Sequence, residues 1–246
     1  MSDDLLAKVE GVRRVMVLFF IIDTSGSMDG DKIGKVNQAI KDVVPEIQNI
    51  SNENADAKIK IAVLEFSNGA TWITDKGPVE AENFVWKKLE AVGVTDFGAA
   101  CRTLNDKLST KAFMAEATGS YAPALILLSD GEPTDDWKSG LDKLKGNNWF
   151  KAAIKVAIAI GEGADKNVLK EFTGSIETVL EVNNGAALVK MIRFVSVRAS
   201  QVASKSSNAD PSAGNADEAK QKELEKSMVE IKDEIAELPD TSSENW

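Results

Sequence analysis

The 246-residue sequence contains no histidine and a single cysteine, Cys101. Without histidine the chain cannot form a Ser-His or Cys-His nucleophile pair, and it cannot bind zinc or haem through imidazole. One cysteine permits neither an internal disulfide nor a thiolate cluster, which fits a reducing compartment. Ligand or metal chemistry in this chain therefore has to use oxygen atoms from carboxylates, hydroxyls and carbonyls.

Basic residues are fewer than acidic residues, and no long apolar segment is present. The chain has 29 Lys and Arg against 39 Asp and Glu, a net charge of −10, so a nucleic-acid groove, which needs a basic patch, is not expected. The longest apolar run, residues 15–22, is much shorter than the roughly 20 residues that span a bilayer. The N-terminal sequence is acidic, unlike the basic start of a secretory signal. We therefore expect a cytoplasmic protein without a membrane segment.

Apolar segments of strand length alternate with segments of helical spacing. The expected strands are residues 15–22, 58–66, 124–128, 154–160 and, more weakly, 177–182; the expected helices are 33–50, 97–108, 137–144 and 187–199. This alternation predicts an α/β fold with a doubly wound, Rossmann-like and mostly parallel sheet, and helices on both faces. The turn at Asn68-Gly69 predicts that residues 71–74 return as one short antiparallel edge strand. The expected sheet then has six strands.

The composition changes near residue 200, which divides the chain. We expect an α/β domain over residues 12–200, a linker rich in small polar residues over 201–216, and an acidic amphipathic helix over 217–239. Residues 201–246 carry 5 basic and 11 acidic side chains, a net charge of −6 out of the total −10. The helix should bury an apolar seam formed by Leu224, Met228, Ile231, Ile235 and Leu238.

Three roles are open for this last helix. It could dock on its own domain or on a second copy of the chain, or it could bind another protein. It could also bring Glu234, Glu237 or Asp240 to a metal as an internal ligand.

Polar side chains gather where the expected strands end. Asp23, Ser25 and Ser27 follow the first strand, Asp130 follows strand 124–128, and Thr95 precedes the helix at 97–108. In an open α/β sheet, ligands bind beyond the carboxyl ends of the strands. Two carboxylates and three hydroxyls are hard oxygen donors, which suit Mg²⁺ or Mn²⁺ and disfavour zinc or copper. These five residues are the candidate metal site, and no catalytic residue is expected.

The order Asp-x-Ser-x-Ser, then Thr95 about seventy residues on, then Asp130 resembles the metal-ion-dependent adhesion site of von Willebrand factor A domains. The resemblance covers roughly residues 12–200 and implies the fold of that family and a non-catalytic protein-interaction module. It implies that Ser25 and Ser27 bind the metal directly and that Thr95 joins them in the ligand-competent state. It also implies that Asp23 and Asp130 act mainly through waters or as hydrogen-bond acceptors for the groups that surround the metal. It also implies a protein partner whose Asp or Glu completes the coordination of the metal.

Within that superfamily, residues 128–137 (LSDGEPTDDW) resemble the bacterial cytosolic TerY/YegL type. Proteins of the TerY type are encoded beside tellurium-resistance genes, often with a kinase and a phosphatase, which implies a stress-response or signalling assembly. Two other functions are open: a Mg²⁺-dependent phosphoryl hydrolase that uses Asp23 or a metal-activated water, and a subunit of a chelatase-like ATPase machine. Signatures of aspartic proteases and haloacid-dehalogenase phosphatases are interrupted by Ser25.

Other polar and reactive residues have simpler explanations. Asp96, Asp135 and Asp136 are expected to cap helices, with Asp96 alternatively shaping the surroundings of the metal. Cys101 lies on the apolar face of its helix and is expected to be buried and inert. Trp137 is expected either to pack at the start of its helix or to anchor an interface.

Overall fold

The computed structural model describes residues 13–116, 119–204 and 216–236. The strands are β1 (Arg14–Asp23), β2 (Ala57–Ser67), β3 (Gly69–Trp72), β4 (Val79–Glu80), β5 (Ala124–Ser129), β6 (Ile154–Ile160) and β7 (Val179–Val182). The helices are α1 (Asp31–Glu53), α2 (Phe97–Lys107), α3 (Trp137–Lys145), α4 (Asn148–Ala152), α5 (Lys166–Thr173), α6 (Gly185–Ala203) and α7 (Ala216–Ala236). Short 3₁₀ turns lie at η1 (Gly26–Met28), η2 (Ala81–Asn83) and η3 (Ile176–Thr178).

The strands form one mixed sheet in the order β3-β2-β1-β5-β6-β7, with β4 also paired to β2. Strands β2, β1, β5, β6 and β7 are parallel, while β3 and β4 run antiparallel to β2. The predicted fold class is confirmed, and the predicted edge strand is present two residues earlier than expected, because Gly69 turns the chain at φ 84°. The prediction of six strands is one too few. It missed β4, which has 2 residues and therefore leaves no periodic signal in the sequence.

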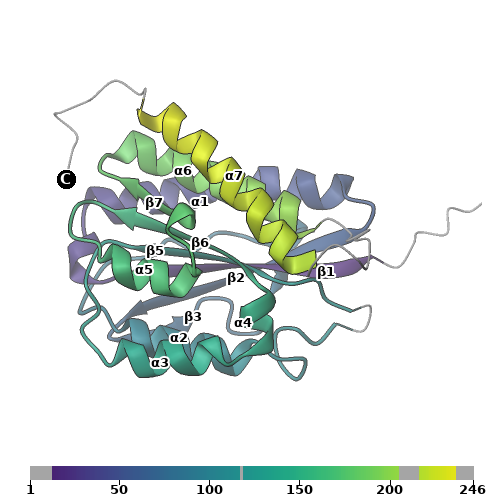
Figure 1. The fold of residues 1–246 in the computed structure, drawn as a ribbon, viewed down its shortest axis with the longest axis horizontal. Coiled ribbons are helices and arrows are strands. Elements are labelled where there is room, and N and C mark those ends of the chain that lie inside the picture. Colours follow the sequence, from purple (N-terminus) through teal and green to yellow (C-terminus); the bar gives the residue numbers. More distant parts are fainter. Residues whose placement is uncertain (1–12, 117–118, 205–215, 237–246) are drawn as a thin grey trace, which may run out of the picture.

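Helices cover both faces of this sheet (Figure 1), with α1, α6 and α7 on one side and α2 to α5 on the other. Strand β1 lies between the two cores. Met16, Leu18, Phe20 and Ile22 face the first core, and Val15, Val17, Phe19 and Ile21 face the second. Because both faces of β1 are buried, its sequence shows a continuous apolar run instead of an alternation.

The predicted helices are present as α1, α2, α3 and α6, and α1 continues across Pro45. Helices α4 and α5, with 5 and 8 residues, were not predicted. Helices of about two turns or fewer show little 3.6-residue periodicity. Among the described helices none is both long and apolar enough to cross a membrane.

Helix α7 docks on its own domain, which was one of the roles left open. Leu224, Met228 and Ile231 are buried in the same core as α1 and α6, as the apolar seam predicted. Ile235, Leu238 and the acids Glu234, Glu237 and Asp240 lie outside the residues whose side chains are described, as do positions 205–215 of the expected linker. Helix α6 continues to Ala203, three residues past the predicted end of the domain.

Polar contacts hold α7 in register with the sheet. The Gln221 side chain accepts a hydrogen bond from the backbone N–H of Lys155 (3.1 Å) and donates to the Lys155 carbonyl (3.3 Å). Lys155 lies at the start of β6, where β7 does not yet pair, because the β6–β7 register begins at Ala157. Gln221 therefore replaces the missing strand at that point of the sheet edge.

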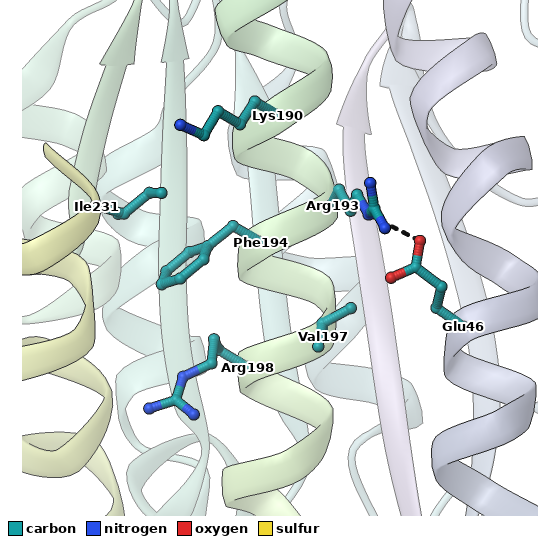
Figure 2. Close-up of a pocket in the computed structure, with 7 residues that line it drawn as sticks. All are labelled: Glu46, Lys190, Arg193, Phe194, Val197, Arg198 and Ile231. Carbon is teal, nitrogen blue, oxygen red and sulfur yellow. Dashed lines mark ion pairs between the residues drawn. The ribbon is translucent and has the colours of Figure 1, made fainter. Parts of the chain in front are cut away.

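A hollow of about 300 Å³ lies over α6, between α1 and α7 (Figure 2). It is lined by Glu46, Lys190, Arg193, Phe194, Val197, Arg198 and Ile231. Its cations already have partners: Arg193 pairs with Glu46 at 2.7 Å, and Arg198 donates to Ser227 of α7 at 2.6 Å. We therefore interpret the hollow as part of the seam between these helices.

Helices α2 and α3 approach each other through two glycines. A Cβ placed on Gly140 of α3 would lie 2.5 Å from the carbonyl oxygen of Gly98 in α2. We expect Gly140→Ala to destabilise the protein by ~1–3 kcal/mol, because backbone atoms cannot give way as a flexible side chain can. The matched control is Gly34→Ala in α1, where a Cβ meets no atom within 4 Å; it should stabilise by ~0.5–1 kcal/mol. Urea unfolding measures both, and equal effects would contradict the prediction.

Candidate functional site

The candidate site lies at the carboxyl ends of β1 and β5, which are parallel neighbours in the sheet. The chain passes from β1 to β2 on one side and reaches β5 on the other, so the strand order reverses between β1 and β5. Such a reversal leaves a crevice at the strand ends, where ligands bind in open α/β sheets. Asp23 is the last residue of β1, and Asp130 follows the last residue of β5.

Asp23 is fully buried, and both of its carboxylate oxygens accept hydrogen bonds. The Ser25 backbone N–H donates to Oδ1 at 2.9 Å, and the Ser129 hydroxyl donates to Oδ2 at 2.6 Å. Burial raises the pKa of Asp23 above its ordinary value, the hydrogen bonds from Ser129 and Ser25 offset part of this rise, and the nearby Asp130 carboxylate adds to it. Asp23 therefore shapes the loop that follows β1, and its carboxyl group lies buried beneath that loop.

A chain of short polar contacts links the two strand ends. The Ser25 and Ser27 hydroxyls lie 3.0 Å apart, and the Ser27 hydroxyl donates to Asp130 Oδ1 at 2.7 Å. The other oxygen of Asp130, Oδ2, accepts from the ammonium of Lys32 at 2.7 Å. Ser25 and Asp130 are each 2% exposed, whereas Ser27 is exposed, so the cluster opens to solvent at Ser27.

Thr95 enters the same cluster from the segment before α2. A Cβ placed on Gly131 would lie 3.5 Å from Thr95 Oγ1 and 3.6 Å from Ser27 Oγ. The two hydroxyls therefore flank the small space that Gly131 leaves open. The structure brings together all five residues of the predicted metal site: Asp23, Ser25, Ser27, Thr95 and Asp130.

Backbone hydrogen bonds fix the loops that carry these side chains. The Val92 N–H donates to the Thr24 carbonyl at 2.7 Å, and the Gly26 N–H donates to the Gly93 carbonyl at 2.9 Å. The Thr134 N–H donates to the Thr95 carbonyl at 2.9 Å. The three loops are thus joined before any ligand arrives, so binding requires little ordering of the chain.

The described residues suit a hard divalent cation. Three hydroxyls and two carboxylates converge at one opening, and oxygen is the donor that Mg²⁺ and Mn²⁺ prefer. Nowhere in the described part of the chain do three or more His, Cys, Asp or Glu side chains gather at one point, so a metal site there needs neutral oxygen donors as well, and the three hydroxyls supply them. The ammonium of Lys32 pairs with Asp130, so this carboxylate already binds a cationic group.

The remaining sequence expectations have separate outcomes. Asp136 caps α3 by accepting from the Ser139 N–H. Asp135 caps α2 from outside that helix, because its carboxylate accepts from the N–H groups of Gly98 and Ala99 at 2.8 Å each. Asp96 lies at the N-cap position of α2, but its side chain makes no cap hydrogen bond to that helix. Its carboxylate accepts from the Gly69 N–H and the Thr134 hydroxyl instead.

The reactivity and packing expectations agree with the structure. Cys101 is buried, and burial raises the pKa of its thiol far above the ordinary range. A thiol held protonated is a poor nucleophile, as expected. Trp137 is partly buried and packs against the core beneath α2 and α3, so of its two predicted roles the packing role is observed.

Sequence reasoning missed two residues of the site. Ser129 lies opposite Asp23 because the β1–β5 register pairs Ile22 with Leu128, and its only sequence signal was adjacency to Asp130. Lys32 lies 98 positions from Asp130 and gave no signal, because a lysine in the first turn of a helix is ordinary.

A family model described as von Willebrand factor type A domain matches residues 18–193. The structure is similar to a von Willebrand factor type A protein from Catenulispora acidiphila (TM-score 0.57, 20% identity, 76% of this chain and 43% of that one). It is also similar to proximal thread matrix protein 1 from the mussel byssus, with a zinc-occupied metal-ion-dependent adhesion motif (0.54, 19%, 75% and 48%).

A third similar structure is the pilus adhesin SpaC from Lactobacillus rhamnosus GG (TM-score 0.59, 15% identity, 76% of this chain and 30% of that one). The chain thus spans less than half the length of each of these three proteins. At such identities the likeness concerns the fold. No curated protein matched the chain.

Proposed function

The chain belongs to the von Willebrand factor type A family, and on that premise we propose that it is a non-catalytic interaction module that binds Mg²⁺ or Mn²⁺. Domains of this family are generally protein-interaction modules with a metal-ion-dependent adhesion site. The proposed ligands and supporting residues are Asp23, Ser25, Ser27, Thr95 and Asp130. The metal would hold an Asp or Glu side chain of a protein partner.

The observation that carries the proposal is the convergence of five oxygen-bearing side chains from three loops at one edge of the sheet. Ser25, Ser27 and Thr95 offer neutral hydroxyls to the metal, and the buried Asp23 and Asp130 supply the negative charge behind them. Neutral donors in direct contact leave the charge of a divalent cation uncompensated on its open side, although the two carboxylates balance it overall. An added carboxylate is then attracted strongly, because its charge meets a cation in a partly buried site.

The geometry of Asp23 supports a binding role more than phosphoryl transfer. A carboxylate nucleophile needs a free oxygen directed at the substrate. Both oxygens of Asp23 accept hydrogen bonds within the fold, and the residue is 0% exposed. With no histidine in the sequence, the common general base is also missing.

Exposed apolar side chains beside the site support a protein as the partner. Val92 and Val94 are 64% and 46% exposed. They flank Gly93, whose carbonyl accepts a hydrogen bond from the N–H of Gly26, between Ser25 and Ser27. A β-branched side chain on an anchored loop offers apolar contact at little entropic cost. A partner loop with an acidic residue next to an apolar one fits this surface.

For the biological setting we propose a cytoplasmic bacterial assembly of the stress-response or signalling type. Residues 128–137 support a TerY/YegL-like protein linked to tellurium resistance. The partner is then a protein encoded nearby, such as a kinase, a phosphatase or an ATPase. Neither nucleic acid nor a membrane is part of the proposal, given a net charge of −10.

Affinity capture in Mg²⁺, followed by elution with EDTA, tests the metal bridge. We expect a specific acidic-loop protein to be released by EDTA and to be absent when the bait is Ser25→Ala. A bait carrying Val92→Ser and Val94→Ser should retain the metal and bind that protein ~10-fold more weakly, because it loses about 1–2 kcal/mol of apolar contact. A partner that stays bound in EDTA would rule out the metal bridge.

A further inference from the structure

Lys32 is the one cation in hydrogen-bond contact with the candidate metal site among the described residues. It is the second residue of α1, which is separated by two residues from the 3₁₀ turn η1 in the loop that carries Ser25 and Ser27. Its ammonium lies 2.7 Å from Asp130 Oδ2, and the side chains of Lys32 and Asp130 are 19% and 0% exposed. An ion pair this sheltered from solvent is screened far less than one on the surface.

The position of this ammonium relative to the proposed metal ligands is well defined. Asp130 uses Oδ1 for the Ser27 hydroxyl and Oδ2 for Lys32, both at 2.7 Å. Lys32 and Ser27 are therefore separated by one carboxylate group. A cation held at Ser25 and Ser27 would share Asp130 with the Lys32 ammonium, and the two positive groups would repel each other at short range.

We propose that Lys32 sets the charge of the site, so that it weakens metal binding while strengthening the capture of a partner carboxylate. The inference rests on the proposed function. Asp23 and Asp130 carry two negative charges, which a divalent cation cancels. Lys32 adds one positive charge, so the loaded site has a net charge of +1 from these groups. Without Lys32 the same groups sum to zero, and an incoming carboxylate is attracted less strongly.

A purely structural role for Lys32 makes a different prediction. If the ion pair served only to hold α1 against the β5 loop, its loss would loosen the site and weaken metal and carboxylate binding together. The charge role predicts opposite signs, with tighter metal binding and weaker carboxylate capture. The two measurements therefore have to be made on the same variants.

The first experiment measures Mn²⁺ binding to the full chain by isothermal titration calorimetry. We expect Lys32→Met to bind Mn²⁺ at least about tenfold more tightly than the unmodified chain, because the repulsion is removed. Lys32→Arg keeps the charge and should stay within about threefold. Lys41→Met is the matched control: it removes the same charge from an exposed position of the same helix, about 13 Å further along the axis, and should change nothing.

The second experiment uses acetate as the carboxylate probe on the Mn²⁺-loaded protein. Water-proton relaxation reports the displacement of metal-bound water by acetate. We expect acetate to bind at least about threefold more weakly to Lys32→Met than to the unmodified chain and to Lys32→Arg. Thermal melting in EDTA establishes that each variant is folded. If Lys32→Met does not fold, Lys32→Gln, which is neutral and keeps a donor for Asp130, replaces it.

The outcomes separate this inference from the proposed function. If the unmodified chain binds no Mn²⁺, the proposed function is wrong and the inference is wrong with it. If the unmodified chain binds Mn²⁺ but the neutral variant binds it equally well or more weakly, only the role of Lys32 is overturned. Tighter metal binding with unchanged or stronger acetate binding overturns the second half of the proposal.

Discussion

Ser25→Ala is expected to weaken Mn²⁺ or Mg²⁺ binding by roughly 100-fold or more and to abolish metal-dependent capture of a partner. The Ser25 hydroxyl lies 3.0 Å from the Ser27 hydroxyl and is 2% exposed, so its removal leaves a gap that water fills without the fixed geometry of the loop. The backbone N–H of Ser25 still donates to Asp23, which keeps the loop folded. Calorimetry measures the affinity, and urea unfolding measures the stability.

The control for this variant is Ser139→Ala in α3, an exposed serine of the same size. It should bind Mn²⁺ as the unmodified chain does. Metal binding that survives Ser25→Ala with an unchanged dissociation constant would contradict the proposed ligand set. EDTA should have the same effect on capture as Ser25→Ala, without any change in the folded state.

Asp23→Ala should also abolish capture of the partner, but this variant does not separate loss of the metal site from loss of stability. Its removal leaves the Ser25 N–H and the Ser129 hydroxyl without their acceptor in a buried place. Each unsatisfied group costs about 1–3 kcal/mol, so part of the loss would come from a weakened fold. Ser25→Ala removes a proposed ligand and keeps the hydrogen bonds that Asp23 accepts from the Ser25 backbone N–H and the Ser129 hydroxyl.

Leu224→Ala is expected to lower the free energy of unfolding by ~2–5 kcal/mol, because it removes a fully buried side chain and leaves a cavity. Leu224 is 0% exposed and packs in the core that α7 shares with α1 and α6. If α7 were an independent appendage, the substitution would barely affect the domain. Urea unfolding followed by the fluorescence of the 5 tryptophans measures the change.

Val229→Ala is the matched control on the same helix, since Val229 is 44% exposed. Its effect should lie within about 0.5 kcal/mol. A Leu224→Ala variant that unfolds at the same urea concentration as the control would show that α7 does not hold the domain together. Sedimentation at several protein concentrations is a further check. If α7 docks within its own chain, α7 contacts between copies should not raise the measured mass as the concentration increases.

Much of the fold could be predicted because it depends on patterns within short stretches of chain. A strand buried on both faces, such as β1, needs a continuous apolar run, and helix α1 shows its apolar stripe over many turns. The metal-site candidates were likewise predictable, since Asp23, Ser25 and Ser27 occur within five residues at a strand end. Elements of a few residues, such as β4 and α4, could not be predicted, because they contain less than two periods of any pattern.

The sequence by itself determined the chemistry available to this protein. Without histidine and with one buried thiol, only oxygen donors remain, and the sequence places them at strand ends where a parallel sheet binds ligands. Only the tertiary structure decided which hydrogen-bond partners hold these donors and which charged group lies beside them. Ser129 meets Asp23 through strand register, and Lys32 meets Asp130 across 98 positions of sequence. Such contacts depend on distances in space. These distances are set by the packing of the whole chain, so no local sequence pattern indicates them.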